Sequence, residues 1–233
     1  MPRIYTYEKT TSTNSVLKDM INKNPINFPN TVVISYQQTE GRGRLKRVFS
    51  SPEGGLYISL SFKEGDIPFP TATAAVYSML AIKAIGIQTK IKWLNDLYFK
   101  GKKVSGILAE KVKSYIIVGI GINITTKESS FPKELQNKAT SLFPGENERL
   151  KELRDSLAKN IIENFYQKKE EDIFSLYEEN CFTLNSPITV NSFDKTYVAK
   201  AIGINHNFEL LVKDSQNQVH TLSTGEIILS QPQ

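Results

Sequence analysis

Residues 89–124 constrain the fold most strongly, because they contain short strand-like segments joined by turns. The segments span 89–93, 97–99, 104–110 and 115–124. Asn95-Asp96 and Lys100-Gly101, which are typical turn pairs, separate the first three. Strands at this spacing pair with their chain neighbours, so the segment predicts a β-meander and an antiparallel sheet.

Helices and further strands are predicted on either side of the meander. Ser12-Thr13-Asn14 precedes Val16, Leu17, Met20 and Ile21 at helical spacing, which indicates an N-cap and an amphipathic helix. The other predicted elements are strands at 31–36 and 56–62, a core helix at 71–85 that ends before Gly86, and one or two helices within 148–179.

The character of the chain changes after Asn185, where short strands and turns replace the longer periodic segments. Predicted strands span 188–190, 197–202, 208–212, 219–222 and 227–229. This pattern predicts a small SH3-like β-barrel at 186–233, after a larger domain at 1–185. The predicted fold class is α+β, with a mixed, largely antiparallel sheet and helices on one face of it, plus the small barrel.

Composition restricts the class of protein. Hydrophobic residues make up 39% of the 233 positions, enough for a real core, so disorder is not expected. Cys181 is the single cysteine, which argues against a disulfide framework and fits a reducing compartment. The first residues contain no apolar signal core, and no apolar run reaches membrane-spanning length. We therefore expect a soluble, cytoplasmic protein that does not bind membranes.

The net charge of +5 indicates an anionic partner. The lysines are spread along the chain without a basic tail or a recognition helix, so a specific nucleic-acid partner is not expected. Gly119-Ile120-Gly121 lies within an apolar strand-like run, unlike a dinucleotide-binding turn, and no Walker motif is present. His206 and His220 lie in the small β domain, so neither a histidine triad nor a zinc site is expected. Cys181 is interpreted as a small buried hydrophobe.

An arginine–glycine segment, Gly41-Arg42-Gly43-Arg44, lies between two predicted strands and continues to Arg47. Glycine allows the backbone to approach a ligand closely, and exposed amides in such a loop form a concavity for anions. Arginine donates forked hydrogen bonds to carboxylates and phosphates. A solvated charged loop is the plainer interpretation. We predict a loop that closes over an anionic small molecule.

A second polar cluster follows from the meander. Lys92, Asn95 and Asp96 lie near a strand end, and Lys103 returns beside them on the next strand. Two cations, an amide and a carboxylate suit the positioning and charge neutralisation that phosphoryl and nucleotidyl transfer require. Asp96 is a predicted Mg²⁺ ligand, because that ion takes oxygen ligands and often only one or two carboxylates. A simple turn at Asn95-Asp96 is the alternative.

Taken together, these motifs resemble the biotin protein ligase family over nearly the whole chain. The residues that carry the resemblance are Ser12-Thr13-Asn14, Gln38, Gly41-Arg42-Gly43-Arg44, Ser51-Pro52, Leu56-Tyr57-Ile58-Ser59, Lys92-Trp93-Leu94-Asn95-Asp96, residues 103–108 with Glu110, residues 119–123 and Gly225-Glu226-Ile227. The resemblance implies that biotin and ATP, with Mg²⁺, form biotinyl-5′-AMP and pyrophosphate in the domain at 1–185. A lysine of a biotin carboxyl carrier domain then accepts biotin, and AMP leaves.

The resemblance also assigns roles to individual residues. The biotin-binding residues would be Ser12, Thr13, Asn14, Gln38, Gly41, Arg42, Gly43, Arg44, Lys103 and Gly106, with Ile107 and Leu108 as apolar walls. The nucleotide-binding residues would be Arg44, Arg47, Phe49, Trp93, Asn95 and Asn123, with Asp96 on the metal. Lys103 and Arg44 would be catalytic, because cations must screen the repulsion between a carboxylate and a phosphate.

The chain departs from the family pattern at Leu94, Lys46 and Phe49, where proline, glycine and tryptophan are usual. The sequence begins directly at the ligase motifs, so we expect ligase activity without operator binding. The resemblance is compatible with a homodimer. A lipoate ligase or octanoyltransferase, which shares the catalytic fold, is the nearest alternative. A non-catalytic basic protein that binds RNA is a more distant one.

Overall fold

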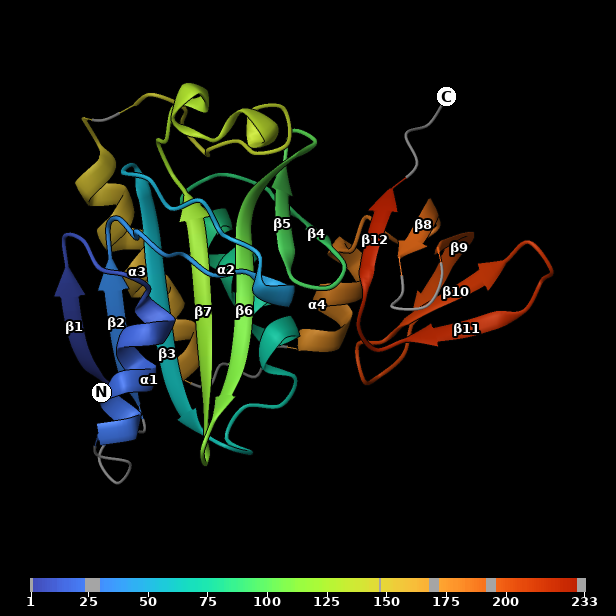
Figure 1. Ribbon diagram of the computed structural model, residues 1–233, viewed down its shortest axis with the longest axis horizontal. Coiled ribbons are helices and arrows are strands. Elements are labelled where there is room, and N and C mark those ends of the chain that lie inside the picture. The colour runs from blue at the N-terminus through green and yellow to red at the C-terminus, as the bar shows by residue number, and fades with distance from the viewer. Residues whose placement is uncertain (1, 24–29, 147, 168–171, 192–195, 230–233) are drawn as a thin grey trace.

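A computed structural model describes residues 2–23, 30–146, 148–167, 172–191 and 196–229. Its larger sheet has the strand order β1-β2-β3-β7-β6-β5-β4 (Figure 1). The strands are β1 (Arg3–Tyr7), β2 (Thr31–Ser35), β3 (Gly55–Lys63), β4 (Lys90–Lys92), β5 (Asp96–Phe99), β6 (Lys102–Val112) and β7 (Tyr115–Asn123). Strands β4 to β7 pair in chain order and antiparallel, so the predicted meander is confirmed.

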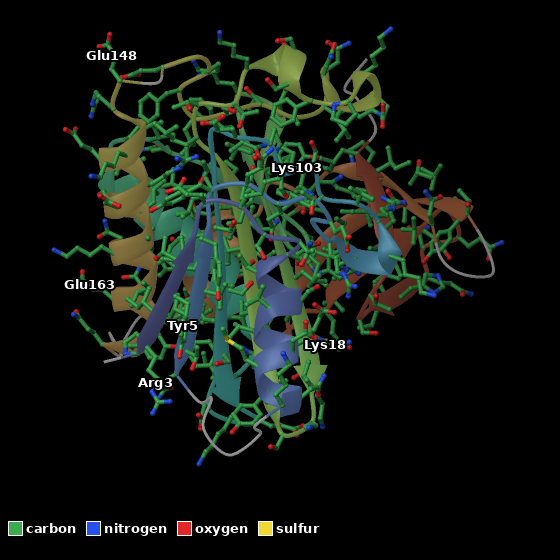
Figure 2. All side chains as sticks on the ribbon, turned by 60° about the vertical axis from the view of Figure 1, so that its left-hand side comes forward. Arg3, Tyr5, Lys18, Lys103, Glu148 and Glu163 are labelled. Atoms are coloured by element: carbon green, nitrogen blue, oxygen red, sulfur yellow. The ribbon has the colours of Figure 1, made fainter. Side chains whose placement is uncertain are left out.

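The sheet is mixed because β1 pairs in parallel with β2. β1 is not among the strands expected from the sequence, and its side chains are mostly exposed at the outer edge of the sheet. Figure 2 labels Arg3 and Tyr5 on this edge strand, well away from Lys103 at the upper end of the sheet. An exposed strand contains no core-facing alternation that would identify it from sequence.

Four α-helices lie within the described residues. They are α1 (Thr13–Lys23), α2 (Pro70–Ala84), α3 (Leu150–Tyr166) and α4 (Ile173–Asn180), with short 3₁₀ turns η1 (Arg44–Lys46), η2 (Glu128–Ser130) and η3 (Lys133–Leu135). The segment predicted as one or two helices forms α3 and α4, and residues 168–171 between them lie outside the described residues. None of the described helices is long and apolar enough to cross a membrane.

The helices cover both faces of the large sheet, so the prediction of helices on one face is wrong. Leu17 and Ile21 of α1 pack with Val33 and Ile117 on one face. Helices α2 and α3 pack against the other face, and Figure 1 shows α1 in front of the sheet with α2 and α3 behind it. The alternation of β3 predicts a solvent-facing side, but α1 covers that side and Ser59 is fully buried.

A second, smaller sheet lies beside α4 with the order β11-β10-β9-β8-β12 (Figure 1). Its strands are β8 (Pro187–Asn191), β9 (Thr196–Ile204), β10 (Leu210–Asp214), β11 (Val219–Leu222) and β12 (Glu226–Leu229), which match the predicted strands. Strands β11 and β12 are the two ends of the sheet and are not paired with each other in the described part of the chain. The small β domain is therefore an open sheet, and the predicted closure into an SH3-like barrel is not confirmed.

Candidate active site

A cavity of about 540 Å³ lies on the α1 face of the large sheet, beside the first turn of α1. The predicted site residues that line it are Ser12, Thr13, Asn14, Gln38, Arg42, Gly43, Arg44, Arg47, Phe49, Trp93, Asn95, Asp96, Lys103, Gly106 and Asn123. They come from α1, from four strands or their ends, and from the loop at 41–50. The fold thus brings together residues that are far apart in the sequence.

Gly41 is the predicted site residue that does not line the cavity. A Cβ atom at this position would lie 2.3 Å from the Phe49 carbonyl oxygen and 2.4 Å from Ser51 Oγ. The Phe49 amide also donates a hydrogen bond to the Gly41 carbonyl at 2.9 Å. The missing side chain of Gly41 therefore serves the close packing of the loop base, and its contact with a ligand stays a prediction.

One end of the cavity consists of neutral hydrogen-bonding groups. The Thr13 amide donates to Gln38 Oε1 at 2.8 Å, and the Thr13 hydroxyl lies 3.2 Å from the same oxygen. Gln38 Nε2 in turn donates to Ser51 Oγ at 2.8 Å. A backbone N–H can only donate, so these contacts determine which way the Gln38 amide points. This end suits a neutral polar ring.

Glycines form the middle of the cavity floor. Gly106 and Gly121 are direct partners on β6 and β7. A Cβ on Gly106 would lie 2.9 Å from the Phe49 ring, and one on Gly121 would lie 2.5 Å from it. The Phe49 ring therefore rests directly on exposed backbone, and Lys103 Nζ lies 5.7 Å from the ring centroid. The Phe49 ring and the Lys103 side chain therefore both lie against the middle of the cavity floor.

The other end of the cavity is charged. Lys103 Nζ lies 2.7 Å from Asp96 Oδ1 in an ion pair. Arg44 donates to Asn95 Oδ1 at 3.1 Å, and Asn95 Nδ2 donates to the Ile107 carbonyl at 2.8 Å. Burial lowers the pKa of the Lys92 ammonium and that of the Arg44 guanidinium, in both cases against the opposing effect of Asp96. An anionic ligand placed here would offset the cost of burying these cations.

The small domain completes this charged end. Arg47 donates two hydrogen bonds to Glu226 on β12, at 2.7 and 2.5 Å. Arg44 donates to Thr224 Oγ1 at 3.1 Å and to the Gly225 carbonyl at 3.3 Å. The hydrogen bond from Arg47 lowers the pKa of the Glu226 carboxyl. Gly225 and Glu226 are recognisable as a motif in the sequence, but only the fold brings them to the cavity.

Further lining residues come from the segment after β7. They are Phe131, Leu135, Lys138 and Ala139. The segment contains no motif, and it reaches the cavity because the Lys103 amide donates to the Lys138 carbonyl at 2.9 Å. No local pattern would have identified these residues.

Trp93 has a structural role in addition to lining the cavity. Its indole Nε1 donates to the Phe208 carbonyl at 2.9 Å, and its amide donates to Thr183 Oγ1 at 2.9 Å. The side chain is 3% exposed. It therefore anchors the edge of the large sheet to the small domain.

Cys181 and the histidines lie outside the site. Cys181 is buried and does not line the cavity, and burial raises the pKa of its thiol. His220 Nε2 lies 2.6 Å from Asp214 Oδ2 within the small sheet, and the His206 ring packs on Phe174. Among the described residues, no group of three or more His, Cys, Asp or Glu side chains is arranged to hold a metal ion. The sequence-based interpretation of Cys181 as a small buried hydrophobe is confirmed.

Comparison with known proteins identifies the family. The profile of the biotin/lipoate A/B protein ligase family matches residues 6–126. The chain belongs to this family. The resemblance predicted from the sequence motifs is thus confirmed. The matched residues include α1, the loop at 41–50 and strands β4 to β7, which contribute residues to the cavity lining.

Two individual relatives of this chain have names that include a ligase activity. The bifunctional ligase/repressor BirA of Bacillus subtilis is 33% identical over 231 residues, which cover 90% of this chain and 69% of BirA. The biotin–[acetyl-CoA-carboxylase] ligase of Mycobacterium tuberculosis is 28% identical over 68% of this chain and 64% of the relative. The chain thus spans about two thirds of the length of these relatives.

A solved structure extends the likeness to three dimensions. The biotin protein ligase from Aquifex aeolicus in complex with biotin and ATP has a TM-score of 0.81 and 28% identity, with full coverage of both chains. A biotin acetyl coenzyme A carboxylase synthetase from Helicobacter pylori, with a TM-score of 0.67 and 20% identity, shares the fold.

Proposed function

We propose that this chain is a biotin protein ligase, which makes biotinyl-5′-AMP from biotin and ATP and transfers the biotinyl group to a carrier lysine. The observation that best supports this function is the cavity, in which a neutral hydrogen-bonding end, a glycine floor and a cationic end follow one another. Biotin has the same order of features: a ureido ring, an apolar tail and a carboxylate.

Biotin is placed by matching these features. Ser12, Thr13 and Gln38 meet the ureido ring, with Arg42 and Gly43 of the loop beside it. The tail follows the floor at Gly106, and the Phe49 ring that packs on this glycine must move aside for it. This placement brings the carboxylate toward the cationic end.

In the first step, a biotin carboxylate oxygen bonds to the α-phosphorus of ATP, and the bond to pyrophosphate breaks. Lys103 and Arg44 screen the repulsion between the two anions and hold them in line. Arg47, Asn95 and Asn123 serve the nucleotide, with the Phe49 and Trp93 rings beside it. Because the anhydride is reactive, the loop at 41–50 must keep water away from it.

The donor set at the charged end fits Mg²⁺. The Asp96 carboxylate lines the cavity, and the buried Asn123 Oδ1 has no hydrogen-bond partner in the structure. Mg²⁺ takes oxygen ligands and commonly uses one or two protein groups together with substrate phosphates. When bound, the ion would neutralise phosphate charge. Lys103 Nζ pairs with Asp96 Oδ1, and a metal ion held by that carboxylate would leave the Lys103 ammonium free to meet the substrate anions.

In the second step, a lysine amine of a biotin carboxyl carrier domain attacks the anhydride carbonyl, and AMP leaves. The exposed edge strand β1 offers backbone groups that can extend the sheet, either to the carrier or to a second copy in a homodimer. We assign the chemistry to residues 1–185 and a supporting role to residues 186–233. A reducing cytoplasm is consistent with the buried free thiol of Cys181.

Calorimetric titration tests the proposal. The protein is titrated with biotin, lipoate and octanoate, each with and without ATP and Mg²⁺. Of the three ligands, we expect only biotin to bind, and we expect heat of turnover to follow when ATP and Mg²⁺ are added. Binding of lipoate or octanoate in place of biotin would move the chain to another branch of the family, and binding of none would overturn a ligase function.

A further inference from the structure

Glu110 is a charged residue of the site region that the proposed mechanism does not use. It lies on β6, on the same face as Gly106 and Leu108, but it does not line the cavity. Its Oε2 atom accepts a hydrogen bond from Asn14 Nδ2 at 2.7 Å. The carboxylate therefore contacts the first turn of α1 from behind the neutral end of the cavity.

Asn14 is held in place on every side. Its side chain is 5% exposed, and a Cβ on Gly119 would lie 2.2 Å from Asn14 Oδ1. The Leu108 carbonyl lies 3.5 Å from Asn14 Nδ2, which is too long for a strong bond. Glu110 thus supplies the strong hydrogen bond that decides which way the Asn14 amide points, because a carboxylate only accepts.

The direction of this amide reaches the cavity through Ser59. With Nδ2 directed at Glu110, Asn14 Oδ1 faces Ser59 Oγ at 2.6 Å. Ser59 Oγ also lies 2.6 Å from Thr13 Oγ1. Ser59 has one hydroxyl proton. Because Ser59 donates it to Asn14 Oδ1, it cannot also donate a hydrogen bond to Thr13 Oγ1. A reversed Asn14 amide would place its N–H groups against Ser59 Oγ, and the Ser59 hydroxyl would then donate its hydrogen bond to Thr13 Oγ1.

We propose that Glu110 is a positioning residue, which fixes the Asn14 amide and, through Ser59, the hydrogen-bonding character of the Thr13 hydroxyl that a ureido ring meets. This inference rests on the proposed biotin site. It predicts that Glu110 governs the affinity for biotin but neither the affinity for ATP nor the chemical step.

The test compares Glu110→Leu with Glu110→Gln in biotin-dependent exchange of pyrophosphate into ATP. Leucine removes the acceptor, and we expect the KM for biotin to rise about tenfold, the worth of one charge-assisted hydrogen bond. The KM for ATP and kcat should stay within about twofold. Glutamine keeps an acceptor oxygen for Asn14 and should restore the KM for biotin to near the wild-type value.

Two further variants make the result decisive. In an Asn14→Ala background, Glu110→Leu should add nothing to the KM for biotin, because the contact through which it acts is gone. Glu64→Leu removes a carboxylate that pairs with exposed Lys111 and should leave all constants unchanged. Thermal melting reports folding, and if Glu110→Leu does not fold, Glu110→Ala is measured in its place.

The outcomes separate the two levels of inference. Suppose that the wild-type enzyme is active. If Glu110→Leu leaves the KM for biotin unchanged, or if Glu110→Gln raises it as much as Glu110→Leu does, the role of Glu110 is overturned while the proposed function stands. Equal losses in both KM values and kcat would show a general structural effect and would also overturn it. Wild-type protein that shows no biotin-dependent exchange would overturn the proposed function, and this inference with it.

Discussion

Two glycines on β7 leave space that neighbouring side chains occupy. Gly119 faces Asn14, and Gly121 faces the Phe49 ring, each at a distance where a Cβ atom would overlap its neighbour. Both positions lie on the strand face that α1 covers. At the residue scale, the shape of the site is therefore set as much by missing side chains as by present ones.

Replacing Gly119 by alanine should destabilise the protein. The new Cβ would lie 2.2 Å from Asn14 Oδ1, and Asn14 cannot retreat because Glu110 and Ser59 hold it. Overpacking of this kind costs about 1–3 kcal/mol of unfolding free energy, measured by urea denaturation. Gly203→Ala is the control, because its nearest neighbour is 3.7 Å away. Equal stability of the two variants would contradict the argument.

Replacing Lys103 by alanine should abolish adenylate formation and leave the fold intact. The Lys103 ammonium is the cation paired with Asp96 at the charged end, and loss of one group that stabilises transition-state charge costs about 10²–10³-fold in kcat. Pyrophosphate exchange measures the effect. Lys102→Ala is the matched control, because that neighbouring lysine pairs with Glu128 at the surface. Normal exchange by Lys103→Ala would remove Lys103 from the site.

At the scale of elements, the loop at 41–50 joins the large sheet to β12. Ser51 Oγ donates to the Phe49 carbonyl at the base of the loop, and Arg47 pairs with Glu226 at its tip. Leu45 and Lys46 have φ angles of 53° and 60°, a left-handed conformation that glycine adopts more readily. Lys46 stands where the family usually has glycine, so contacts at both ends of the loop must compensate for this strain.

Loss of Glu226 should loosen the loop. In Glu226→Ala, trypsin should cleave the ligand-free loop about two- to fivefold faster, a modest change because exposed ion pairs contribute little. Biotin with ATP and Mg²⁺ should protect the loop in both proteins, because the adenylate orders it. Glu128→Ala removes a comparable surface pair elsewhere and serves as control. Equal cleavage with and without ligand would contradict closure of the loop.

The same link has a defined pH dependence. The hydrogen bond from Arg47 lowers the pKa of Glu226 below its ordinary value. The ion pair therefore contributes its full stabilisation of the loop at every pH above the ordinary pKa of a glutamate. That contribution is lost only as the pH falls through the lowered pKa. Trypsin sensitivity of the loop should therefore be constant across neutral pH, and a rise between pH 8 and pH 6 would contradict this assignment.

At the scale of the whole molecule, aromatic packing joins the small sheet to helices α2 and α4. The Phe208 ring lies 5.0 Å from Phe69, 5.2 Å from Tyr177 and 5.7 Å from Phe174, measured between ring centroids. Phe208 follows β9 in the small domain, and its carbonyl accepts the hydrogen bond from Trp93. The small domain is thus part of the same hydrophobic core as α2 and α4.

Replacing Phe208 by alanine should destabilise both parts together. The expected loss is about 3–5 kcal/mol of unfolding free energy, typical of a buried phenylalanine. Fluorescence of Trp93, the single tryptophan, and far-UV circular dichroism should shift to the same lower midpoint. Val198→Ala, at an exposed position of β9, is the control. A shift in circular dichroism without a shift in fluorescence would show that the small domain unfolds independently.

The sequence alone determined the elements whose signals are local. The meander from β4 to β7, helix α2 with the glycine stop signal at Gly86 just after it, and the strands of the small sheet each follow from periodicity and turn residues within a few positions. The ordered motifs also predicted the family, and they named most of the residues that line the cavity.

Only the tertiary structure decided how distant segments meet. It placed α1 on the face opposite α2 and α3, packed Gly41 against Phe49 and Ser51, and brought Glu226 to Arg47, 179 positions away. It also showed that Glu110 contacts Asn14 across 96 positions. Periodicity records which side of an element is buried but not what buries it, because that depends on the path of the whole chain.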